Sequence, residues 1–449
     1  MADNTYAGSG GVLADISDAQ ADSLFSQALA RALADNGVRQ GAKVLLLPPD
    51  ITRLHSRAGF FTCVAYRELL KRGIGVTVLP ALGTHVAMSD SERERMFPGI
   101  PKELFRVHDW RNDVAELGRI EKEWVARVTQ GAVSYDWPVQ VNRLLLEGSF
   151  SLIISLGQVA PHEVIGMANH AKNIFVGIGG KEAIDKSHFA GAVYGMEKMM
   201  GKPDTPVRAL LDEGMRRYGG RLPPILYVLT VLSARADAEI EAGAICGDLA
   251  LRGLYVGCGR ECFAQAATLS QRVNVHVLDE PVHKAVAYLD PEEFRTTWLG
   301  NKAVYRTRMA MADGGELLVI APGLKGFGED KAIDALIRRH GYRPGRVIRE
   351  KVNSDPELAH SLSAAAHLIH GSSEGRFTVR YCPGPGLSRE EIESVGFEWG
   401  GISAALARYD INTLSSGWNT LRDGEKIFFV PNPALGLWAC PRACPQGLA

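Results

Sequence analysis

Short apolar runs alternate with longer amphipathic segments along most of the chain. The runs over 43–48, 76–80 and 151–156 have the length of strands, and segments over 18–36 and 59–71 have the apolar spacing of helices. Strands that are apolar along their whole length are typical of parallel sheets with helices on both faces. The pattern therefore predicts an α/β fold.

A second set of α/β elements follows. Its predicted strands span 225–232, 273–278, 285–289 and 316–322. A helix is expected over 330–340, because Gly341 and Pro344 follow it as stop signals.

A chain of 449 residues is too long for one ordinary domain. We expect two α/β domains with mostly parallel sheets, 1–275 and 276–449, with the active site in the cleft between them. Residues 431–449 are rich in Pro, Gly and Ala, which predicts a tail packed across the other domain.

Charge and hydropathy narrow the function classes. The formal net charge is -1 with 22% charged residues, so no excess of either sign favours nucleic acid or an anionic membrane surface. No apolar run approaches the roughly 18 to 20 residues that span a bilayer. The first residues lack the basic and apolar regions of a secretion signal, which favours a cytoplasmic protein.

Seven cysteines are present, an odd number, and none forms a CxxC pair. They are Cys63, Cys246, Cys258, Cys262, Cys382, Cys440 and Cys444. We interpret them as free thiols in a reducing cytoplasm. The two pairs with three intervening residues leave a structural zinc site open as an alternative.

Polar residues follow three of the predicted strands. Asp50 and Arg53 come after 43–48, His85 after 76–80 and His162 after 151–156. Ligands bind beyond the carboxyl ends of the strands in open α/β sheets, so three such segments favour a pocket. Taken singly, Asp50 and Arg53 fit helix capping or mutual pairing equally well, and each His fits an ordinary loop residue.

The segment 161–189 carries three histidines and Lys172 among small residues. Gly177, Gly179 and Gly180 would let backbone N–H groups approach a phosphate, and a helix starting near Lys181 would add its dipole. Sequence signatures of ATP, dinucleotide, serine-hydrolase and HExxH zinc sites are missing. A zinc pair of His162 and His170 remains open, although they are eight residues apart.

These motifs resemble the nickel-dependent lactate racemase family over most of the chain. The resemblance rests on Asp50-Ile-Thr-Arg53, on Leu82-Gly-Thr-His85, and on two spacings. His162 lies ten residues before Lys172, and His188 lies sixteen after it.

The resemblance implies a covalent cofactor and a reaction. Lys172 would carry a nickel-pincer nucleotide, the pyridinium-3-thioamide-5-thiocarboxylic acid mononucleotide, which other proteins synthesise, and His188 would bind its nickel. His85 and His162 would be the acid/base pair while hydride leaves C2 of a 2-hydroxy acid and returns to the other face. Asp50 and Arg53 would orient His85 and the substrate.

The sequence departs from the family in two places. Asn169-His170-Ala171 replaces a glycine pair and a basic residue, and we interpret His170 as a support of the cofactor site or an added contact. In the second domain the family's substrate-binding Lys does not align, and Met309 falls at its position. Residues 276–449 would supply the substrate-closing domain, and 1–275 the cofactor-binding domain.

Lys302 and Arg306 would share one face of a helix in that second domain, beside Asn301 and Tyr305. Such a face suits a carboxylate and several hydroxyls, and a solvated basic face is the alternative. With His55, Arg57 and Ser372-Ser373-Glu374, this composition favours a sugar acid and hence an aldonate 2-epimerase. Lactate or malate racemisation, a catalytically silent hydroxy-acid-binding protein, and a zinc hydrolase or lyase are the alternatives.

Overall fold

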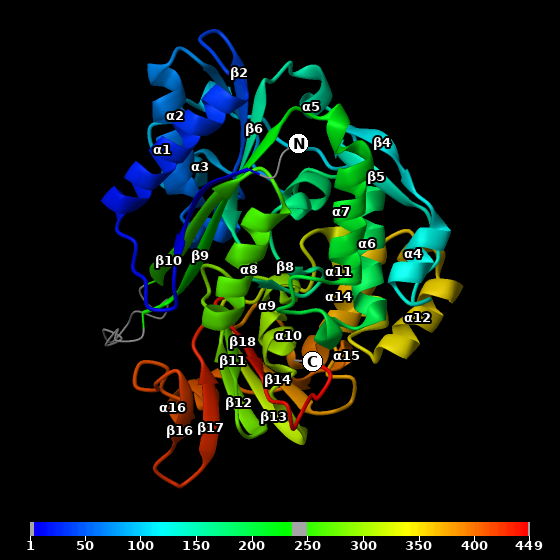
Figure 1. The fold of residues 1–449 in the computed structure, drawn as a ribbon. Coiled ribbons are helices and arrows are strands. Elements are labelled where there is room, and N and C mark those ends of the chain that lie inside the picture. Colours follow the sequence, from blue (N-terminus) through cyan, green and yellow to red (C-terminus); the bar gives the residue numbers. More distant parts are fainter. Residues whose placement is uncertain (1–3, 236–248, 448–449) are drawn as a thin grey trace. The chain divides into compact units, whose positions relative to one another are not determined.

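The computed structural model describes residues 4–235 and 249–447. These residues form two compact units (Figure 1). The first unit comprises 4–187, 201–233 and 249–273, and the second comprises 188–200, 234–235 and 274–447. The predicted α/β class with mostly parallel sheets is confirmed in both units. The domain boundary expected near residue 275 stays a prediction.

A six-stranded sheet of order β1-β10-β9-β6-β2-β3 forms the centre of the first unit. β2 is parallel to β3 and to β6, and β6 is parallel to β9, whereas β1 is antiparallel to β10. The strands are β1 (Thr5–Gly10), β2 (Lys43–Leu47), β3 (Gly75–Val78), β6 (Leu152–Gln158), β9 (Ile225–Ala234) and β10 (Leu249–Gly257).

The two faces of this sheet follow from the two-residue period of its strands. Leu226 and Val228 of β9 pack in the core formed with Phe25 of α1 and Phe61 of α2, so these helices cover one face (Figure 1). Residues between them point to the opposite face. Tyr227 of β9 and its cross-strand neighbour Ser155 of β6 therefore lie together on that second face.

Helices and smaller strands surround the sheet of the first unit. Its helices are α1 (Asp18–Asp35), α2 (Ala58–Lys71), α3 (Asp90–Met96), α4 (Lys122–Val128), α5 (Leu144–Glu147), α7 (Pro206–Tyr218) and α8 (Arg260–Asn274), and α6 (Lys181–Tyr194) begins in it. Single turns are η1 (Ile51–Ser56), η2 (Lys102–Leu104), η3 (Asn173–Gly177) and η5 (Gly219–Arg221). Two hairpins pair β4 (Val114–Ile120) with β5 (Trp137–Asn142) and β7 (Pro161–His162) with β8 (Gly166–Met167).

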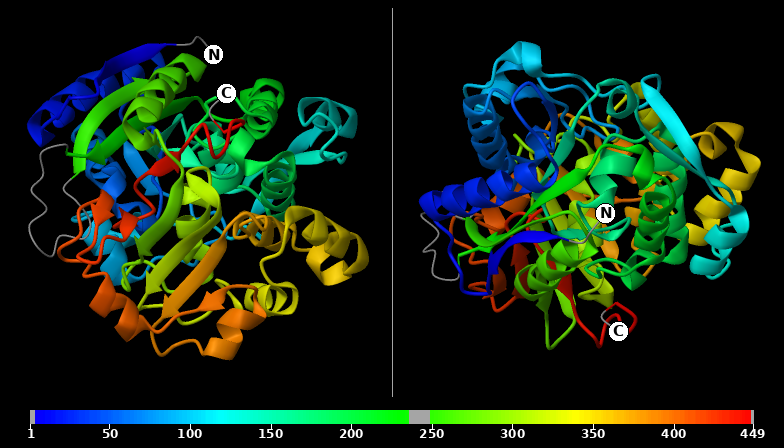
Figure 2. Two further views of the ribbon diagram at one scale, coloured as in Figure 1. Left: turned by 90° about the horizontal axis from the view of Figure 1, so that it is seen from below. Right: turned by 45° about the horizontal axis from the view of Figure 1, so that its top comes forward.

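The second unit contains a sheet of order β15-β14-β13-β12-β17-β16, which is parallel except for β16 (Figure 2). Its strands are β12 (Val282–Tyr288), β13 (Met311–Ala321), β14 (Thr378–Pro383), β15 (Glu398–Trp399), β16 (Gly417–Thr420) and β17 (Lys426–Val430). Its helices and turns are η4 (Met196–Lys198), α9 (Thr297–Gly300), α10 (Lys302–Thr307), α11 (Lys331–His340), α12 (Gly345–Ser354), α13 (Pro356–Ala359), α14 (Leu362–His370), α15 (Arg389–Ser394) and α16 (Ile402–Arg408).

Alternate residues of β13 again serve two cores. Leu317 and Val319 pack in the core that contains Ile337 of α11, whereas Leu318 and Ile320 pack in a smaller core with Ala405 of α16. Both faces of this sheet are therefore covered by helices, as its continuously apolar strands predict.

Two details of the predicted organisation need correction or completion. The predicted strand 225–232 was grouped with the second set, but it is β9 and pairs with β6 in the first sheet. In the C-terminal segment, β18 (Leu437–Ala439) pairs in parallel with β11 (Val275–Val277), and the Cys440 N–H donates to the Met309 carbonyl. These contacts anchor residues 437–440 inside the second unit.

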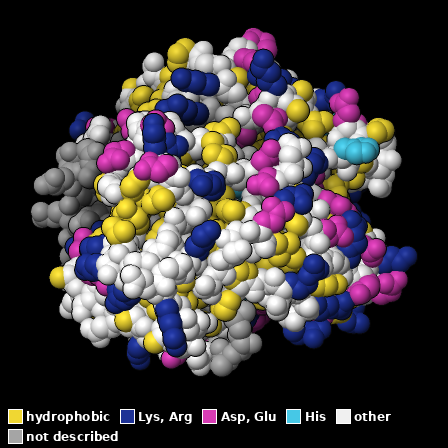
Figure 3. Space-filling model, turned by 90° about the horizontal axis from the view of Figure 1, so that it is seen from above, with side chains coloured by type: hydrophobic (Ala, Val, Ile, Leu, Met, Phe, Trp, Pro, Cys, Tyr) yellow, Lys and Arg dark blue, Asp and Glu magenta, His cyan; other side chains and the backbone are white. Residues whose placement is uncertain are grey.

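The surface and the remaining sequence features can be stated briefly. Basic and acidic side chains are interspersed on the face drawn in Figure 3, in keeping with the balanced composition. Among the described residues, no helix has both the length and the apolar character needed to cross a membrane. Six cysteines are free thiols, and Cys246 lies outside the described residues.

Candidate functional site

Three parallel neighbours in the first sheet bring the predicted site residues to one edge. β6, β2 and β3 are adjacent and run in the same direction, so their carboxyl ends coincide. The segments beyond β2 and β3 stay side by side, because Pro49 and Ala81 form a further bridge. Asp50, His85 and His162 follow β2, β3 and β6 respectively, which is the edge where open α/β sheets bind ligands.

Asp50 and His85 form a direct pair. The His85 Nδ1 atom lies 2.6 Å from Asp50 Oδ2, and Asp50 Oδ1 accepts hydrogen bonds from the Thr52 N–H at 3.2 Å and its hydroxyl at 2.5 Å. Asp50 is buried, which by itself would raise the pKa of its carboxyl. The charge and hydrogen bond of His85, the Thr52 bond and the Arg53 charge more than offset burial and hold that pKa below its ordinary value.

A tight turn presents His85. The His85 N–H donates to the Leu82 carbonyl at 3.0 Å, and Gly83 adopts φ +58°, a conformation that favours glycine. The Gly83 N–H donates to the Gly177 carbonyl at 2.8 Å. The turn that carries His85 is thus tied to the segment that carries Lys172.

His162 is buried at the end of β7. Its Nδ1 atom accepts a hydrogen bond from the Val164 N–H at 3.1 Å, and Glu163 Oε2 lies 3.8 Å from the same nitrogen. An amide N–H can only donate, so Nδ1 carries a lone pair in this arrangement.

Lys172 projects from a turn with an unusual backbone. Asn169 and His170 both adopt left-handed conformations, with φ values of +71° and +60°. Just after Lys172, the Asn173 side-chain amide donates to Ser155 Oγ at 3.2 Å and to the Leu156 carbonyl at 3.3 Å. These bonds dock the turn on the second face of the sheet.

The amine of Lys172 lies in a strongly charged environment. Burial and the positive charge of Arg53 lower its pKa to about 8, against the opposing effects of Glu163 and Asp50. Arg208 adds a further positive charge. About a fifth of this amine is therefore neutral near pH 7.4, far more than of an ordinary lysine, and the neutral form is the nucleophile.

The three predicted glycines have packing reasons of their own. A Cβ atom would lie 2.0 Å from the Phe175 carbonyl oxygen at Gly179, 2.3 Å from Gln140 Oε1 at Gly180 and 2.9 Å from the Ala81 Cβ at Gly177. Close packing therefore accounts for these glycines. Contact of their N–H groups with a phosphate stays a prediction.

Helix α6 begins at Lys181, where the sequence predicted a helix start. The Lys181 N–H donates to the Trp110 carbonyl at 3.0 Å, and the Ala183 N–H donates to Gln140 Oε1 at 3.3 Å. Two of the amides at this helix start thus have protein acceptors.

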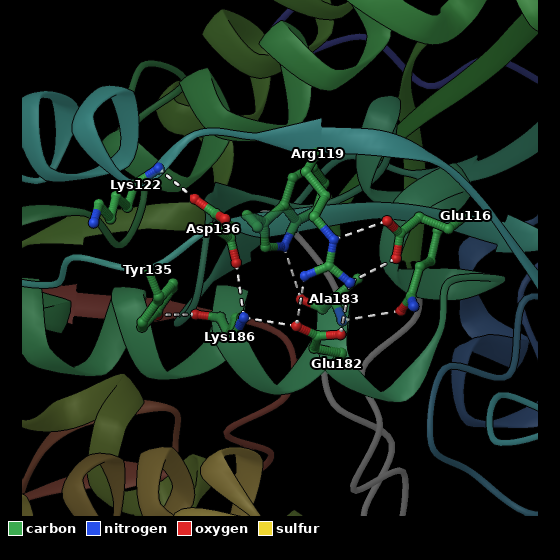
Figure 4. Close-up of polar contacts among 10 residues, drawn as sticks. Glu116, Arg119, Lys122, Tyr135, Asp136, Glu182, Ala183 and Lys186 are labelled. Carbon is green, nitrogen blue, oxygen red and sulfur yellow. Dashed lines mark hydrogen bonds and ion pairs between the residues drawn. The ribbon is translucent and has the colours of Figure 1, made fainter.

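The β4–β5 hairpin fixes the first turns of α6 (Figure 4). Arg119 pairs with Glu182 at 3.3 Å, and the Lys186 ammonium donates to the Asp136 carbonyl at 2.7 Å. The Tyr135 hydroxyl donates to the Lys186 carbonyl at 2.5 Å. His188, the predicted nickel ligand, follows on the same helix.

His170 is enclosed by aromatic rings on the second face of the sheet. Its ring centroid lies 4.2 Å from that of Tyr227 and 5.3 Å from that of Phe263, and its Nδ1 atom is 3.9 Å from Asp212. Burial and the charges of Arg208 and Arg260 hold the pKa of this imidazole well below its ordinary value. A neutral ring packed against two aromatic rings is suited to support the turn before Lys172.

The residues predicted to bind substrate in the second unit lie on α10, and all six of its residues are buried. Lys302 Nζ lies 3.9 Å from Glu293 Oε1 and 5.3 Å from the centroid of Phe294, and Arg306 is 2% exposed. The alternative of a solvated basic face is therefore wrong. Neighbouring Asn301 accepts a hydrogen bond from the Tyr381 hydroxyl at 2.7 Å.

Other residues named from sequence have structural partners. Arg57 pairs with Asp18, and Glu374 accepts the Gly345 N–H at 2.9 Å. Ser372 and Ser373 line a cavity of about 260 Å³ in the second unit. No group of three or more His, Cys, Asp or Glu suited to a metal ion occurs within 4–235 and 249–447.

Two residues beside the site escaped the sequence analysis. Glu163 is one of them, and its sequence signal is its position next to His162, because a carboxylate beside a candidate acid/base His can shift the pKa of the ring. Arg208 gave no local signal, because its contacts with the 167–169 backbone span about forty residues of sequence.

Comparison with known proteins identifies a family for part of the chain. Residues 16–201 match the lactate racemase N-terminal domain. A crystal structure of a Thermotoga maritima protein has a TM-score of 0.78 and 23% identity, covering 96% of this chain and 100% of that one. The lactate racemase apoprotein of Thermoanaerobacterium thermosaccharolyticum has a TM-score of 0.64 and 16% identity, covering 90% and 88%. No curated protein sequence matches the chain.

The packing at Gly179 predicts a large effect of one added methyl group. Gly179→Ala should lower the free energy of unfolding by about 1 to 3 kcal/mol, because its Cβ would overlap the Phe175 carbonyl. Denaturant unfolding measures this change. Gly220→Ala is the matched control, since nothing lies within 4 Å of a Cβ there, and it should change stability by less than about 0.5 kcal/mol. Equal stability of the two variants would contradict the packing argument.

Proposed function

We propose that the chain, whose residues 16–201 match the lactate racemase N-terminal domain, is a lactate racemase-like protein that inverts C2 of a 2-hydroxy acid. The main support within the structure is the Asp50–His85 pair, which lies at the same sheet edge as His162. We propose a sugar acid as the substrate and aldonate 2-epimerisation as the reaction.

The residues around Lys172 fit the covalent cofactor that the family implies. Thioamide formation needs a neutral primary amine, and the lowered pKa of Lys172, about 8, supplies one. Lys172 would hold a nickel-pincer nucleotide, which brings donors of its own, and His188 would supply one further ligand to its nickel. When bound, this group would supply a reversible acceptor for the hydrogen on C2.

Asp50 determines the state in which His85 works. A carboxylate whose pKa is lowered stays ionised and only accepts hydrogen bonds, so His85 must carry its proton on Nδ1. The lone pair is then on Nε2, which is the form that accepts a hydroxyl proton. Asp50 also stabilises the imidazolium that results, so Asp50 acts by orienting His85.

His162 is held in the complementary state. Because its Nδ1 accepts the Val164 N–H, the neutral ring carries its proton on Nε2 and offers a donor to the oxygen on C2. Reaction from the other epimer requires a lone pair on Nε2 and a proton on Nδ1. Glu163, 3.8 Å from Nδ1, is the carboxylate placed to accept that proton's hydrogen bond.

The substrate class rests on α10. Lys302 and Arg306 are four residues apart on one helix. Both are buried, so their charges do not serve to solvate the protein surface. Buried cations with an adjacent amide, Asn301, suit a carboxylate followed by hydroxyls. Lactate has too few polar groups to satisfy such a set, and this mismatch favours a sugar acid.

The alternative functions differ in their substrate or in the metal and lysine modification of the purified protein. Lactate or malate racemisation would use the same residues on a smaller substrate. A silent binding protein would retain unmodified Lys172, and a zinc hydrolase or lyase would contain stoichiometric zinc. We propose a cytoplasmic enzyme that receives its cofactor from separate biosynthesis proteins.

Covalent attachment gives the most direct test. When the protein is made in cells that synthesise the cofactor, the Lys172 peptide should carry the cofactor mass and the protein should contain nickel. Lys172→Ala should lose both, together with all activity, because no other amine replaces it. Lys122→Ala, at an exposed lysine, is the control. An active preparation with unmodified Lys172 would refute the mechanism.

The paired roles of the histidines predict an incomplete reaction in single variants. His85→Asn and His162→Asn should each abolish interconversion of the two C2 epimers, while 2-keto acid still forms from one of them. Chromatography of each pure epimer after incubation measures this. His360→Asn, at an exposed surface position, should retain normal turnover. Full activity of the double variant would rule out both assignments.

Arg306 tests the substrate class. Loss of a charge-assisted hydrogen bond costs on the order of 1.5 to 3 kcal/mol, so Arg306→Ala should lower kcat/KM for the true sugar acid by about tenfold to over a hundredfold. The loss should be smaller for lactate, which makes fewer contacts. Arg338→Ala, in an exposed pair with Asp334, is the control. An equal loss for every hydroxy acid in a stably folded variant would remove the argument for a sugar acid.

A further inference from the structure

Arg208, near the start of α7, is a buried cation whose guanidinium donates hydrogen bonds to backbone carbonyls that precede Lys172. Its Nη2 donates to the Met167 carbonyl at 2.5 Å and its Nη1 donates to the Asn169 carbonyl at 3.1 Å. The side chain is 1% exposed, and its guanidinium lies 4.3 Å from the centroid of Phe263. A planar fork of donors is the geometry that can hold two carbonyls at once.

Further bonds connect the start of α7 with the same stretch of chain. The Thr205 hydroxyl caps α7 by accepting the Arg208 N–H at 3.0 Å, and it donates to the Ile165 carbonyl at 3.1 Å. The Gly201 N–H donates to the Gly166 carbonyl at 3.0 Å. The start of α7 is thus bonded to residues 165, 167 and 169, and Gly201, which precedes the helix, is bonded to residue 166.

The turn that Arg208 holds would be unfavourable without support. Asn169 and His170 are consecutive left-handed residues, a conformation that side-chain-bearing residues rarely adopt in succession. The Asn169 side chain fills the space beside Gly157, where a Cβ would lie 2.6 Å from its Nδ2 atom. The Asn169 carbonyl held by Arg208 immediately precedes His170, so the fork acts at the centre of the turn.

Removing a guanidinium from water is energetically costly. Burial, reinforced by the nearby charge of Arg260 and only partly offset by Asp212, lowers the pKa of Arg208 to about 10. An apolar residue would fill the same volume against Phe263 without this cost. An apolar residue could not donate the two hydrogen bonds to the Met167 and Asn169 carbonyls.

We propose that Arg208 is a positioning residue for Lys172, holding the Met167 and Asn169 carbonyls so that the left-handed turn presents the lysine amine. This inference rests on the proposed role of Lys172 as the cofactor anchor. Arg208 acts through the backbone and is not assigned any contact with substrate or cofactor.

The test uses full-length protein made without the cofactor. Lys172 acylation by acetic anhydride is followed by peptide mass across a pH series, with exposed Lys122 as internal reference. Deuterium exchange of the peptide covering 169–177 reports the turn itself. The variants are Arg208→Met, Arg208→Lys and, as control, Arg216→Met, which removes an exposed arginine from the same helix.

Wild-type Lys172 should titrate with a midpoint near pH 8. Arg208→Met removes a positive charge and loosens the turn, so the midpoint should rise, and a rise of one pH unit should slow acylation at pH 8 about fivefold. Exchange over 169–177 should accelerate. Arg208→Lys keeps the charge without the fork, so it should accelerate exchange with a smaller change of midpoint. Arg216→Met should match wild type in both measurements.

A rescue variant separates positioning from general stability. Glycine adopts the left-handed conformation without strain, so Asn169→Gly in the Arg208→Met or Arg208→Lys background should restore part of the lost protection over 169–177. The proposal would be overturned by folded Arg208 variants in which the midpoint of Lys172 acylation and the deuterium exchange over 169–177 are unchanged. If Arg208→Met fails to fold, Arg208→Lys provides this test. This test uses protein without cofactor, so its outcome does not depend on the proposed function. Failure of the proposed function would appear in the separate cofactor-loaded preparation, as active protein with unmodified Lys172.

Discussion

The docking of residues 169–177 on the second face of the first sheet is the constraint on which the site depends. The Asn173 side-chain amide donates to Ser155 Oγ and to the Leu156 carbonyl of β6. On the adjacent strand, the Tyr227 ring packs against the His170 ring, with 4.2 Å between the ring centroids. These contacts hold the residues on both sides of Lys172 against the sheet, and the hydrogen bond from the Gly83 N–H to the Gly177 carbonyl connects this segment with the turn that carries His85.

The charges around Lys172 form a second, coupled constraint. Arg53 and Arg208 disfavour its protonated form, while Asp50 and Glu163 favour it. The result is an amine that keeps a pKa of about 8 despite extensive burial. Asp50 also holds His85, so one carboxylate influences both the proposed anchor and one proposed acid/base residue. Removing either partner would therefore perturb more than its own contact.

Much of this arrangement could be predicted from sequence, for identifiable reasons. The strands 43–48 and 151–156 are continuously apolar, so β2 and β6 were expected within two residues of their bounds. The position of Asp50 and His85 after neighbouring strands predicted a pocket, and the resemblance to lactate racemases implied that Asp50 orients His85. The resemblance to lactate racemases supplied the roles of Lys172 and His188, which composition alone would not have given.

Other parts could not be predicted, because they depend on tertiary contacts. An apolar strand such as 225–232 could belong to either sheet. Its pairing with β6 in the structure assigns it to the first sheet. The left-handed turn at Asn169 and His170 exists because Arg208, distant in sequence, stabilises it. The glycines near Lys172 suggested a phosphate cradle, yet their close neighbours are the Phe175 carbonyl and the Gln140 side chain.

The opposite states of the two histidines follow from the donors and acceptors beside them. A carboxylate faces Nδ1 of His85, whereas a backbone N–H faces Nδ1 of His162. If both rings faced carboxylates, both would present lone pairs, and neither would offer a proton to the oxygen on C2. If both faced amides, neither would accept the hydroxyl proton. One of each kind allows a proton to be accepted by one ring while the other ring donates a hydrogen bond. In a reaction that runs from both epimers, the two histidines must be able to exchange these donor and acceptor roles. After the exchange His162 carries a proton on Nδ1, and Glu163 beside it is the acceptor for that proton.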